Sequence, residues 1–358
     1  MKSWHITKHG SLEELKLDEN APLPIITDPL DILVEVKASS INPIDVAMLG
    51  GYGSNIIGLL KTLESFPVTP KVKFPLTLGR DFSGKIVDAG KSVNLEKLKI
   101  GTEVWGSVRS TYQGAQSQYI VVPSTDISLK PESLTHVEAA SIPYVACTTW
   151  VAASTFGRLE PNWFLDKKVL VLGGSGGVGT FAIQLFKSWG AEITTTVNKD
   201  FLEKASELGA TNIVDYTQPD CQFLLSSYGS YDFVLDTIRR NDFKNVLCLL
   251  KPDLSSKYVT LLTPVLPNTD KYGITLGLAK CKLDLACFVF EGLKFGTKVG
   301  WAIYAPNGDA LDEVAKLIEN KKIKPVIETV YSFDQLPLAM KKVSLKHNRG
   351  KTVLDYDL

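Results

Sequence analysis

The sequence predicts an α/β protein with two domains, a β-rich, barrel-like part followed by a doubly wound parallel sheet. The chain has 358 residues, and because a domain typically has about 100–200 residues, two domains are expected. Short apolar-alternating segments separated by Gly and Pro occupy the first part of the chain. Strand and helix patterns alternate after residue 167. The first pattern favours a barrel, and the second favours a parallel sheet with helices on both faces.

The first part carries four segments whose apolar–polar alternation predicts β-strands. Glycine and proline between them favour the short strands of a barrel-like domain. The predicted strands are residues 31–39, 80–90, 101–106 and 118–122. An alanine-rich segment, residues 135–153, then predicts a helix that Pro143 interrupts.

From residue 167 onward, apolar strand patterns alternate with helical patterns. The predicted strands are residues 168–173, 192–197, 212–216, 231–237 and 258–263. The first two are followed by predicted helices at residues 177–189 and 200–208. This order predicts a parallel, doubly wound sheet.

The C-terminal part is less regular. Residues 264–305 contain Gly, Pro and a partly helical apolar stretch, which fits either a lid or apolar wall for a lipophilic substrate, or an oligomer interface. A helix is predicted at residues 309–319, and strands at 325–331 and 350–356. Because the last strands are expected to rejoin the first domain, the predicted domains are residues 1–134 with 323–358, and residues 135–322.

Composition excludes several classes of protein. Lys plus Arg and Asp plus Glu both number 39, so bulk charge gives no reason to expect a nucleic-acid or anionic-membrane partner. The five cysteines are odd in number and scattered, which is typical of a reducing compartment. No apolar run approaches the about 20 residues that span a bilayer. The first ten residues resemble neither a secretory signal nor a mitochondrial presequence.

The strongest motif is Gly-Ser-Gly-Gly-Val-Gly, residues 174–179, which follows a predicted strand and opens a predicted helix. That context predicts a Rossmann dinucleotide site. Glycine allows the backbone to approach a pyrophosphate, and the helix N-terminus offers N–H groups and a partial positive charge. The alternative is a tight strand–helix turn that binds nothing.

The end of the second predicted strand bears on the choice of cofactor. An NAD site usually places Asp or Glu there to bind the ribose 2′-hydroxyl, whereas this chain has Asn198 and Lys199. Lys199 would attract a 2′-phosphate, and the neighbouring Asp200 is placed to cap the next helix. The sequence therefore predicts NADPH over NADH, the alternative being that Lys199 is a solvated loop lysine.

These motifs, together with several shared strings, resemble the medium-chain dehydrogenase/reductase superfamily along essentially the whole chain. The strings lie at residues 42–45, 51–53, 74–81, 143–146, 174–184, 325–328 and 349–353. They are most similar to the zinc-free, quinone-oxidoreductase-like branch. The resemblance implies a GroES-like β-rich barrel domain joined to the Rossmann domain, and a mitochondrial location. A cytosolic location is the alternative, because this chain shows no presequence.

The metal site of the zinc-dependent members is not expected here. Their ligand histidine stands in a Gly-His-Glu string, and this chain reads Gly79-Arg80-Asp81. An arginine side chain is always protonated and donates only, so Arg80 cannot ligate zinc. The cysteine-rich structural lobe is absent, and the four histidines are not clustered. We therefore predict no bound metal.

The resemblance also implies which residues bind NADPH. At the pyrophosphate it implies the loop residues Ser175, Gly176, Gly177 and Val178. At the 2′-phosphate it implies Asn198, Lys199 and Tyr216. Later strand ends and loops would add Thr237, Leu261, Ala302 and Tyr304, and the C-terminal segment His347, Asn348 and Arg349. The sequence departs from the branch at two places. The branch has Ser where this chain has Asn198, and the branch has Asn-Val-Gly-Gly at the positions of residues 237–240. Arg349 fits a domain-joining ion pair equally well.

The candidate reaction centre is Asn42, Asp45 and Tyr52, which belong to the shared strings of the first domain. Tyr52 is placed to donate a proton or to stabilise a developing oxyanion. Alternatives are a turn residue for Tyr52, a turn cap for Asn42 and a helix cap for Asp45. Tyr144 and Thr148 fit the nicotinamide side or, with more support, the core.

The expected function is NADPH-dependent hydride transfer to a small lipophilic acceptor such as a quinone or an enone. One alternative is a 2-enoyl thioester reductase, and a second is an NADPH-binding interaction protein with little catalysis. The resemblance alone suggests a reticulon partner, and a homodimer is expected. No nucleic-acid partner is expected.

Overall fold

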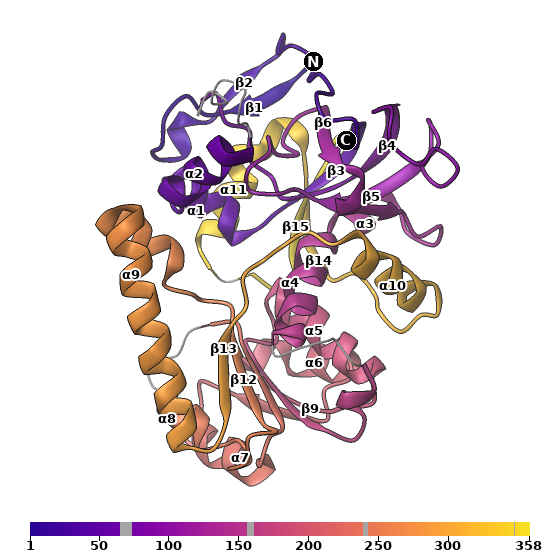
Figure 1. Ribbon diagram of the computed structural model, residues 1–358. Helices are drawn as coiled ribbons and strands as arrows, with labels where there is room; N and C mark the ends of the chain where they lie inside the picture. Colours follow the sequence, from indigo (N-terminus) through magenta and orange to yellow (C-terminus); the bar gives the residue numbers. More distant parts are fainter. Residues whose placement is uncertain (65–73, 156–160, 239–242, 347) are drawn as a thin grey trace.

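A computed structural model describes residues 1–64, 74–155, 161–238, 243–346 and 348–358. In this structure the two chain termini lie together at one end of the molecule, and the parallel sheet lies at the other (Figure 1). A seven-stranded and a six-stranded sheet form the two parts, and a small two-stranded sheet pairs β1 (Ser3–His5) with β2 (Lys16–Asp18).

The seven-stranded sheet has the order β14-β15-β3-β4-β5-β7, with β6 paired to β3. Its strands are β3 (Asp31–Ile41), β4 (Asp81–Ala89), β5 (Glu103–Ser107), β6 (Tyr119–Pro123), β7 (Ile127–Leu129), β14 (Ile327–Ser332) and β15 (Lys351–Asp355). All pairs are antiparallel except β14 with β15. The C-terminal strand β15 thus pairs directly with β3 of the first part.

The six-stranded sheet is entirely parallel, in the order β10-β9-β8-β11-β12-β13. Its strands are β8 (Lys168–Leu172), β9 (Glu192–Val197), β10 (Asn212–Asp215), β11 (Phe233–Asp236), β12 (Lys257–Thr260) and β13 (Lys298–Trp301). The strand order reverses between β8 and β11, which is the arrangement of a doubly wound dinucleotide-binding sheet. The predicted fold class is confirmed.

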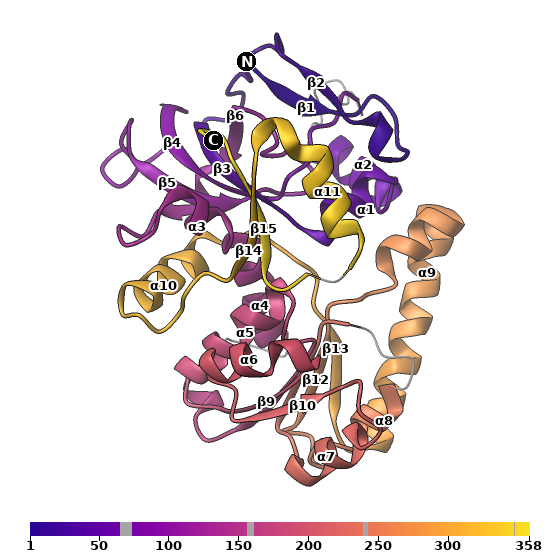
Figure 2. The same cartoon turned by 180° about the vertical axis from the view of Figure 1, so that it is seen from behind.

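Helices cover both sheets. Those beside the parallel sheet are α5 (Gly177–Ser188), α6 (Leu202–Glu207), α7 (Cys221–Tyr228), α8 (Phe243–Leu247) and α9 (Val265–Lys294). The others are α1 (Pro43–Leu49), α2 (Ser54–Glu64), α3 (His136–Ala140), α4 (Pro143–Ser154), α10 (Gly308–Glu319) and α11 (Leu336–Ser344). Figure 2 shows α11 lying over β14 and β15. Ile183, Phe186 and Phe233 are fully buried between α5 and the parallel sheet.

The predicted helix over residues 135–153 is two helices, because Pro143 begins α4 and cannot continue α3. Residues 264–305, which the sequence leaves ambiguous, form α9 followed by β13. Gly273 interrupts α9 with a φ of 76° and a ψ of 171°, a backbone conformation that glycine adopts readily. None of the helices in the described ranges combines the length and the hydropathy that a membrane span needs.

Candidate cofactor and active site

The glycine-rich loop begins at the carboxyl end of β8, beside the point where the strand order reverses. Gly173 has a φ of 88°, and α5 starts at Gly177 without a side-chain cap. Its first N–H groups therefore face the loop with no side-chain acceptor in front of them. A crevice outside the carboxyl ends of the strands at such a switch point is where α/β sheets bind nucleotides.

The glycines of the loop differ in the space around them. A Cβ on Gly174 would lie 2.1 Å from Thr195 Oγ1, and one on Gly179 would lie 2.1 Å from the Gly173 carbonyl oxygen. These two residues are therefore glycine for close packing. A Cβ on Gly176 would meet no atom nearer than 3.8 Å, so this side of the loop is open. An open glycine at a helix N-terminus fits a pyrophosphate.

Other predicted cofactor residues lie along the same edge of the sheet. Each follows a different strand: Asn198 and Lys199 follow β9, Thr237 follows β11, Leu261 follows β12, and Ala302 follows β13. The Thr237 hydroxyl donates to the Leu172 carbonyl oxygen at 2.7 Å. Tyr216 is exposed, and its backbone N–H donates to the Val197 carbonyl oxygen at 3.0 Å.

Two buried amide oxygens of this region accept no hydrogen bond within the described structure, Asn198 Oδ1 and Asn348 Oδ1. Lys199 beside Asn198 is exposed. Ribose hydroxyls would satisfy such acceptors, since a buried polar atom without a partner is costly. The exposed ammonium of Lys199 fits a phosphate.

The C-terminal segment touches the glycine loop. Gly350 N–H donates to the Ser175 carbonyl oxygen at 2.9 Å. Next to it, the Arg349 guanidinium lies 2.7 Å from Asp200 Oδ2, so in this structure Arg349 forms the ion pair considered as its alternative role. His347 lies outside the described residues. The segment therefore joins the two sheets at the loop.

A buried polar cluster lies beneath this junction, with Asp81 at its centre. The two carboxylate oxygens accept hydrogen bonds from four donors: Ser40 Oγ at 2.6 Å, Asn42 Nδ2 at 2.7 Å, Tyr144 N at 2.5 Å and Lys351 Nζ at 3.0 Å. Lys351 Nζ also donates to Asn42 Oδ1. Asp81 is fully buried and the Lys351 side chain is 6% exposed, so this is a desolvated ion pair that spans both parts of the chain.

Asp45 lies next to this cluster and is also fully buried. Its carboxylate accepts from Asn42 N at 2.8 Å and from Gly79 N at 3.1 Å, and it lies 3.8 Å from Arg80 Nε. Burial raises the pKa of Asp45 to about 6, although Arg80 and the hydrogen bond from Asn42 act in the opposite direction. Asp45 thus caps α1, which was the alternative to a catalytic role.

The raised pKa of Asp45 predicts a pH-dependent stability. The folded state binds the Asp45 proton more tightly than the unfolded state does. The resulting stabilisation is therefore complete below about pH 3.8 and is lost as the pH rises through about 6. We expect the wild type to lose unfolding free energy over this range relative to Asp45→Asn, which carries no titrating proton. Urea unfolding of both proteins at several pH values measures this. A constant difference, or one that changes in the opposite direction, would contradict the assignment.

Tyr52 lies in the turn between α1 and α2, where Gly51 and Gly53 have φ values of 91° and 77°. It is half-buried and lines a small pocket with His9, Met48, Ser54, Ile57, Gly58, Lys61 and Leu76. Burial raises the pKa of Tyr144, and the nearby Asp45, Asp81 and Tyr52 raise it further. The Tyr52 phenol therefore lies close enough to Tyr144 to affect the pKa of its phenol.

Tyr304 and Tyr144 bring the loop after β13 against α4. Their ring centroids are 4.2 Å apart with an interplanar angle of 30°, and Tyr304 Oη donates to the Val108 carbonyl oxygen at 3.1 Å. The Thr148 hydroxyl donates back to the Tyr144 carbonyl oxygen at 2.6 Å. Tyr144 is thus held in place from α4 and from the parallel-sheet part of the chain.

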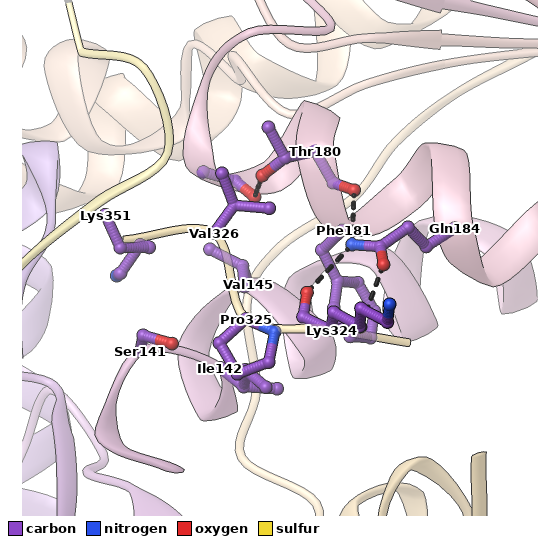
Figure 3. Close-up of a pocket in the computed structure, with 11 residues that line it drawn as sticks. Ser141, Ile142, Val145, Thr180, Phe181, Gln184, Lys324, Pro325, Val326 and Lys351 are labelled. Atoms are coloured by element: carbon purple, nitrogen blue, oxygen red, sulfur yellow. Dashed lines mark hydrogen bonds between the residues drawn. The ribbon is translucent and has the colours of Figure 1, made fainter. Parts of the chain in front are cut away.

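A second small pocket lies beside the start of α5, between α4 and the C-terminal segment (Figure 3). Val145, Gly177, Thr180, Val326 and Lys351 are among its lining residues. Gln184 fixes the connecting segment here, because its amide donates to the Lys324 carbonyl oxygen at 3.0 Å and accepts from Lys324 N at 2.8 Å. A Cβ on Gly177 would lie 2.8 Å from Lys351 Cδ, so the lysine packs directly against the start of α5.

Sequence reasoning placed Asn42, Asp45 and Tyr52 on one strip, and the structure brings the first two into a single buried cluster, with Tyr52 near Tyr144. The sequence alone predicts no role for Asp81 or Lys351. The signal in the sequence that could have indicated a role for Lys351 is its place at the start of a buried strand, where a lysine needs an anionic partner. The partner lies 270 residues away, and local patterns do not identify it.

Comparison with known proteins places the chain in a family. A model of the alcohol dehydrogenase GroES-like domain matches residues 28–132, and a zinc-binding dehydrogenase model matches residues 208–354. NAD(P)H oxidoreductase RTN4IP1, mitochondrial, from Danio rerio is 42% identical over 354 residues, which cover 99% of this chain and 91% of that protein. The chain belongs to this family of NAD(P)H oxidoreductases. The human member is 39% identical, covering 99% of this chain and 89% of its own length.

The RTN4IP1 family assignment confirms the resemblance to the medium-chain dehydrogenase/reductase superfamily. The zebrafish and human relatives are named as mitochondrial proteins, which bears out the mitochondrial location expected from the resemblance. Among solved structures, the quinone oxidoreductase from Coxiella burnetii aligns with a TM-score of 0.77 at 25% identity, covering 99% of both chains. The 2-octenoyl-CoA carboxylase reductase CinF from Streptomyces has a TM-score of 0.78 at 21% identity, covering 99% of this chain and 87% of its own, and shares the fold.

Proposed function

We propose that this NAD(P)H oxidoreductase uses NADPH to reduce a quinone or enone-type acceptor without a metal ion. The observation that carries the proposal is the open face of the glycine loop at Gly176, at the N-terminus of α5 and at the switch point of the parallel sheet. Such a site takes a dinucleotide. NADPH oxidation in the presence of candidate acceptors tests the proposal.

The preference for NADPH over NADH is supported by the end of β9. Asn198 and the exposed Lys199 stand there in place of the acid that binds a ribose 2′-hydroxyl. Lys199 would lose its stabilising contact with a cofactor that lacks the 2′-phosphate. Tyr216 lies next to this strand end and would pack against the adenosine side.

We expect Lys199→Gln to weaken NADPH binding by about tenfold or more, the value of a hydrogen bond to a charged group, and to leave NADH binding unchanged. Fluorescence titration of both cofactors measures the two dissociation constants. Lys204→Gln is the matched control, since Lys204 is exposed on the following helix and pairs with Glu207 at 2.8 Å. An equal effect of both variants, or a wild type that prefers NADH, would contradict the assignment.

Bound NADPH would supply the hydride, and the protein would orient the reactants and supply a proton. Ser175 to Val178, with Asn348 and the backbone at Gly350, would hold the cofactor between the two sheets. We propose that the Tyr52 phenol donates to the oxygen of the acceptor. Asn42 and Asp45 act by position, because the Asn42 amide donates to Asp81 and the Asp45 carboxylate accepts from the backbone N–H groups of Asn42 and Gly79.

The absence of a catalytic metal is proposed from the chemistry of Arg80. The Arg80 side chain is fully buried, and Nη1 donates to the Arg109 carbonyl oxygen at 2.5 Å and to the Tyr112 carbonyl oxygen at 3.3 Å. A hydrogen-bonded guanidinium thus fills the position where the zinc members have a histidine. Nowhere in residues 1–64, 74–155, 161–238, 243–346 and 348–358 do three His, Cys, Asp or Glu side chains gather to hold a metal.

The acceptor and the partners are parts of the same proposal. A quinone acceptor is supported by the Coxiella burnetii neighbour, which is named as a quinone oxidoreductase. A reticulon partner is supported by the name of the Caenorhabditis elegans relative, reticulon-4-interacting protein 1, mitochondrial, which is 35% identical. The expected homodimer stays a prediction.

A further inference from the structure

Helix α9 carries an unusually apolar outer face. Leu276 and Leu283 are both 69% exposed, Phe290 is 61% exposed and Leu293 is 54% exposed. These residues, with the exposed Ala279 and Ala286 between them, define the outer face of α9. In both views of the molecule α9 lies along the outer edge (Figures 1 and 2). A contiguous apolar patch of this kind marks a binding surface.

The orientation of α9 is fixed, so its outer face is not exposed through loose packing. Its inner side buries Gly277, Cys281 and Gly292, and Phe288 packs against Tyr258 at a ring distance of 6.0 Å. A Cβ on Gly292 would lie 2.6 Å from Val299 Cγ1. The helix thus has one apolar face for its own sheet and a second, outward one.

The first turns of α9 are also anchored, at the turn that carries Tyr52. Asp270 Oδ2 accepts from Gly53 N at 2.6 Å, and Asn55 Nδ2 donates to the Thr269 carbonyl oxygen at 3.0 Å. A Cβ on Gly53 would lie 3.2 Å from Leu266 Cδ1. The part of α9 before Gly273 is therefore anchored beside the turn that carries Tyr52.

Lysines border the outer face on both sides. At 3.6 residues per turn, Lys282 falls along one border of this face, and Lys280 and Lys294 fall along the other; all three are exposed. The acids of this stretch are half-buried and paired, Asp284 with Lys280 and Glu291 with Lys294, each at 3.0 Å. The surface is thus apolar in the middle and bordered by three lysines, two of which pair with acids of the same helix.

We propose that the outer face of α9 docks the protein onto an anionic lipid bilayer. An interfacial helix of this kind inserts its apolar side chains at the headgroup boundary while flanking lysines contact anionic headgroups. A second copy of the chain fits less well, because a symmetric pairing of α9 would bring lysine borders together. The proposal is independent of the identity of the acceptor, and it would place the Tyr52 turn near the membrane surface.

The test is flotation of the full chain with vesicles of phosphatidylcholine alone, or with an equal amount of phosphatidylglycerol. Binding is expected only to the anionic vesicles, and it should weaken as salt is raised. Leu283→Gln and Phe290→Gln should each weaken binding about tenfold through lost apolar burial. Lys282→Gln should weaken it about fivefold, the value of one lysine near such a surface.

The matched control is Phe223→Gln, because Phe223 is 72% exposed on α7, away from this face. It should leave vesicle binding unchanged. Absence of binding to anionic vesicles would overturn the proposal. A dimer in light scattering that Phe290→Gln converts to a monomer would overturn it too, because the face would then belong to an interface between copies. Cofactor titration of the same variants should be unchanged, which separates this test from the proposed function.

Discussion

Replacing Lys351 by methionine is expected to lower the free energy of unfolding by about 3–5 kcal/mol, the usual cost of leaving a buried charge without its partner. The variant would leave the Asp81 carboxylate fully buried, with three neutral donors and no cation within the cluster. Hydrogen bonds from those three donors to Asp81 should keep the loss of unfolding free energy near the lower value, about 3 kcal/mol. Urea unfolding at neutral pH measures the change.

Two further variants separate the ion pair from a simple packing defect. Lys351→Met combined with Asp81→Asn removes both charges and should recover part of the loss, because no charge then stays buried. Lys316→Met removes an exposed lysine that pairs with Glu313 at 2.6 Å, and exposed pairs contribute only about 0–1 kcal/mol. If Lys351→Met costs no more than Lys316→Met, the cluster does not hold the two parts of the chain together.

Tyr52→Phe is expected to lower turnover by about 10²–10³, the usual effect of removing a hydrogen-bond donor to a developing oxyanion. The Arg80 guanidinium donates to carbonyl oxygens, so the Tyr52 phenol is the donor that we propose on this strip. Removing one oxygen should leave the glycine loop and the NADPH dissociation constant unchanged. Steady-state kinetics with several acceptors, paired with cofactor titration, measures both quantities.

Tyr144→Phe is the matched comparison, since it removes the neighbouring phenol while Tyr144 N still donates to Asp81. A larger loss of turnover in Tyr144→Phe than in Tyr52→Phe would transfer the proposed role to Tyr144. A Tyr52→Phe enzyme within about twofold of the parent on every acceptor, far below the loss of a true donor, would show that Tyr52 is a turn residue.

Local periodicity was sufficient to predict most of the regular elements. The strand before Gly174 and the helix after it lie where the alternation and the motif place them, because both are dictated by neighbours in the sequence. Residues 264–305 were ambiguous for a physical reason. α9 is apolar on its inner and on its outer face, with charged residues between the two, so it lacks the single apolar stripe by which a surface helix is recognised.

The resemblance implies Asn198, Thr237 and Ala302 as cofactor residues, and each of them follows a strand of the parallel sheet, so all three lie at one edge of that sheet. The pairing of Lys351 with Asp81 could not be predicted, because it depends on β15 aligning against β3 across the length of the chain. The anchoring of α9 at Gly53 by Asp270 is a contact of the same long-range kind.

The most direct test of the central claim is the oxidation of NADPH by the purified protein, with a chelator present throughout. The acceptors would be quinones, enones and 2-enoyl thioesters. We predict turnover with quinones or enones that exceeds turnover with enoyl thioesters, that is faster with NADPH than with NADH, and that survives chelation. Activity lost on chelation and restored by zinc would contradict the account, as would NADPH binding without turnover on any acceptor.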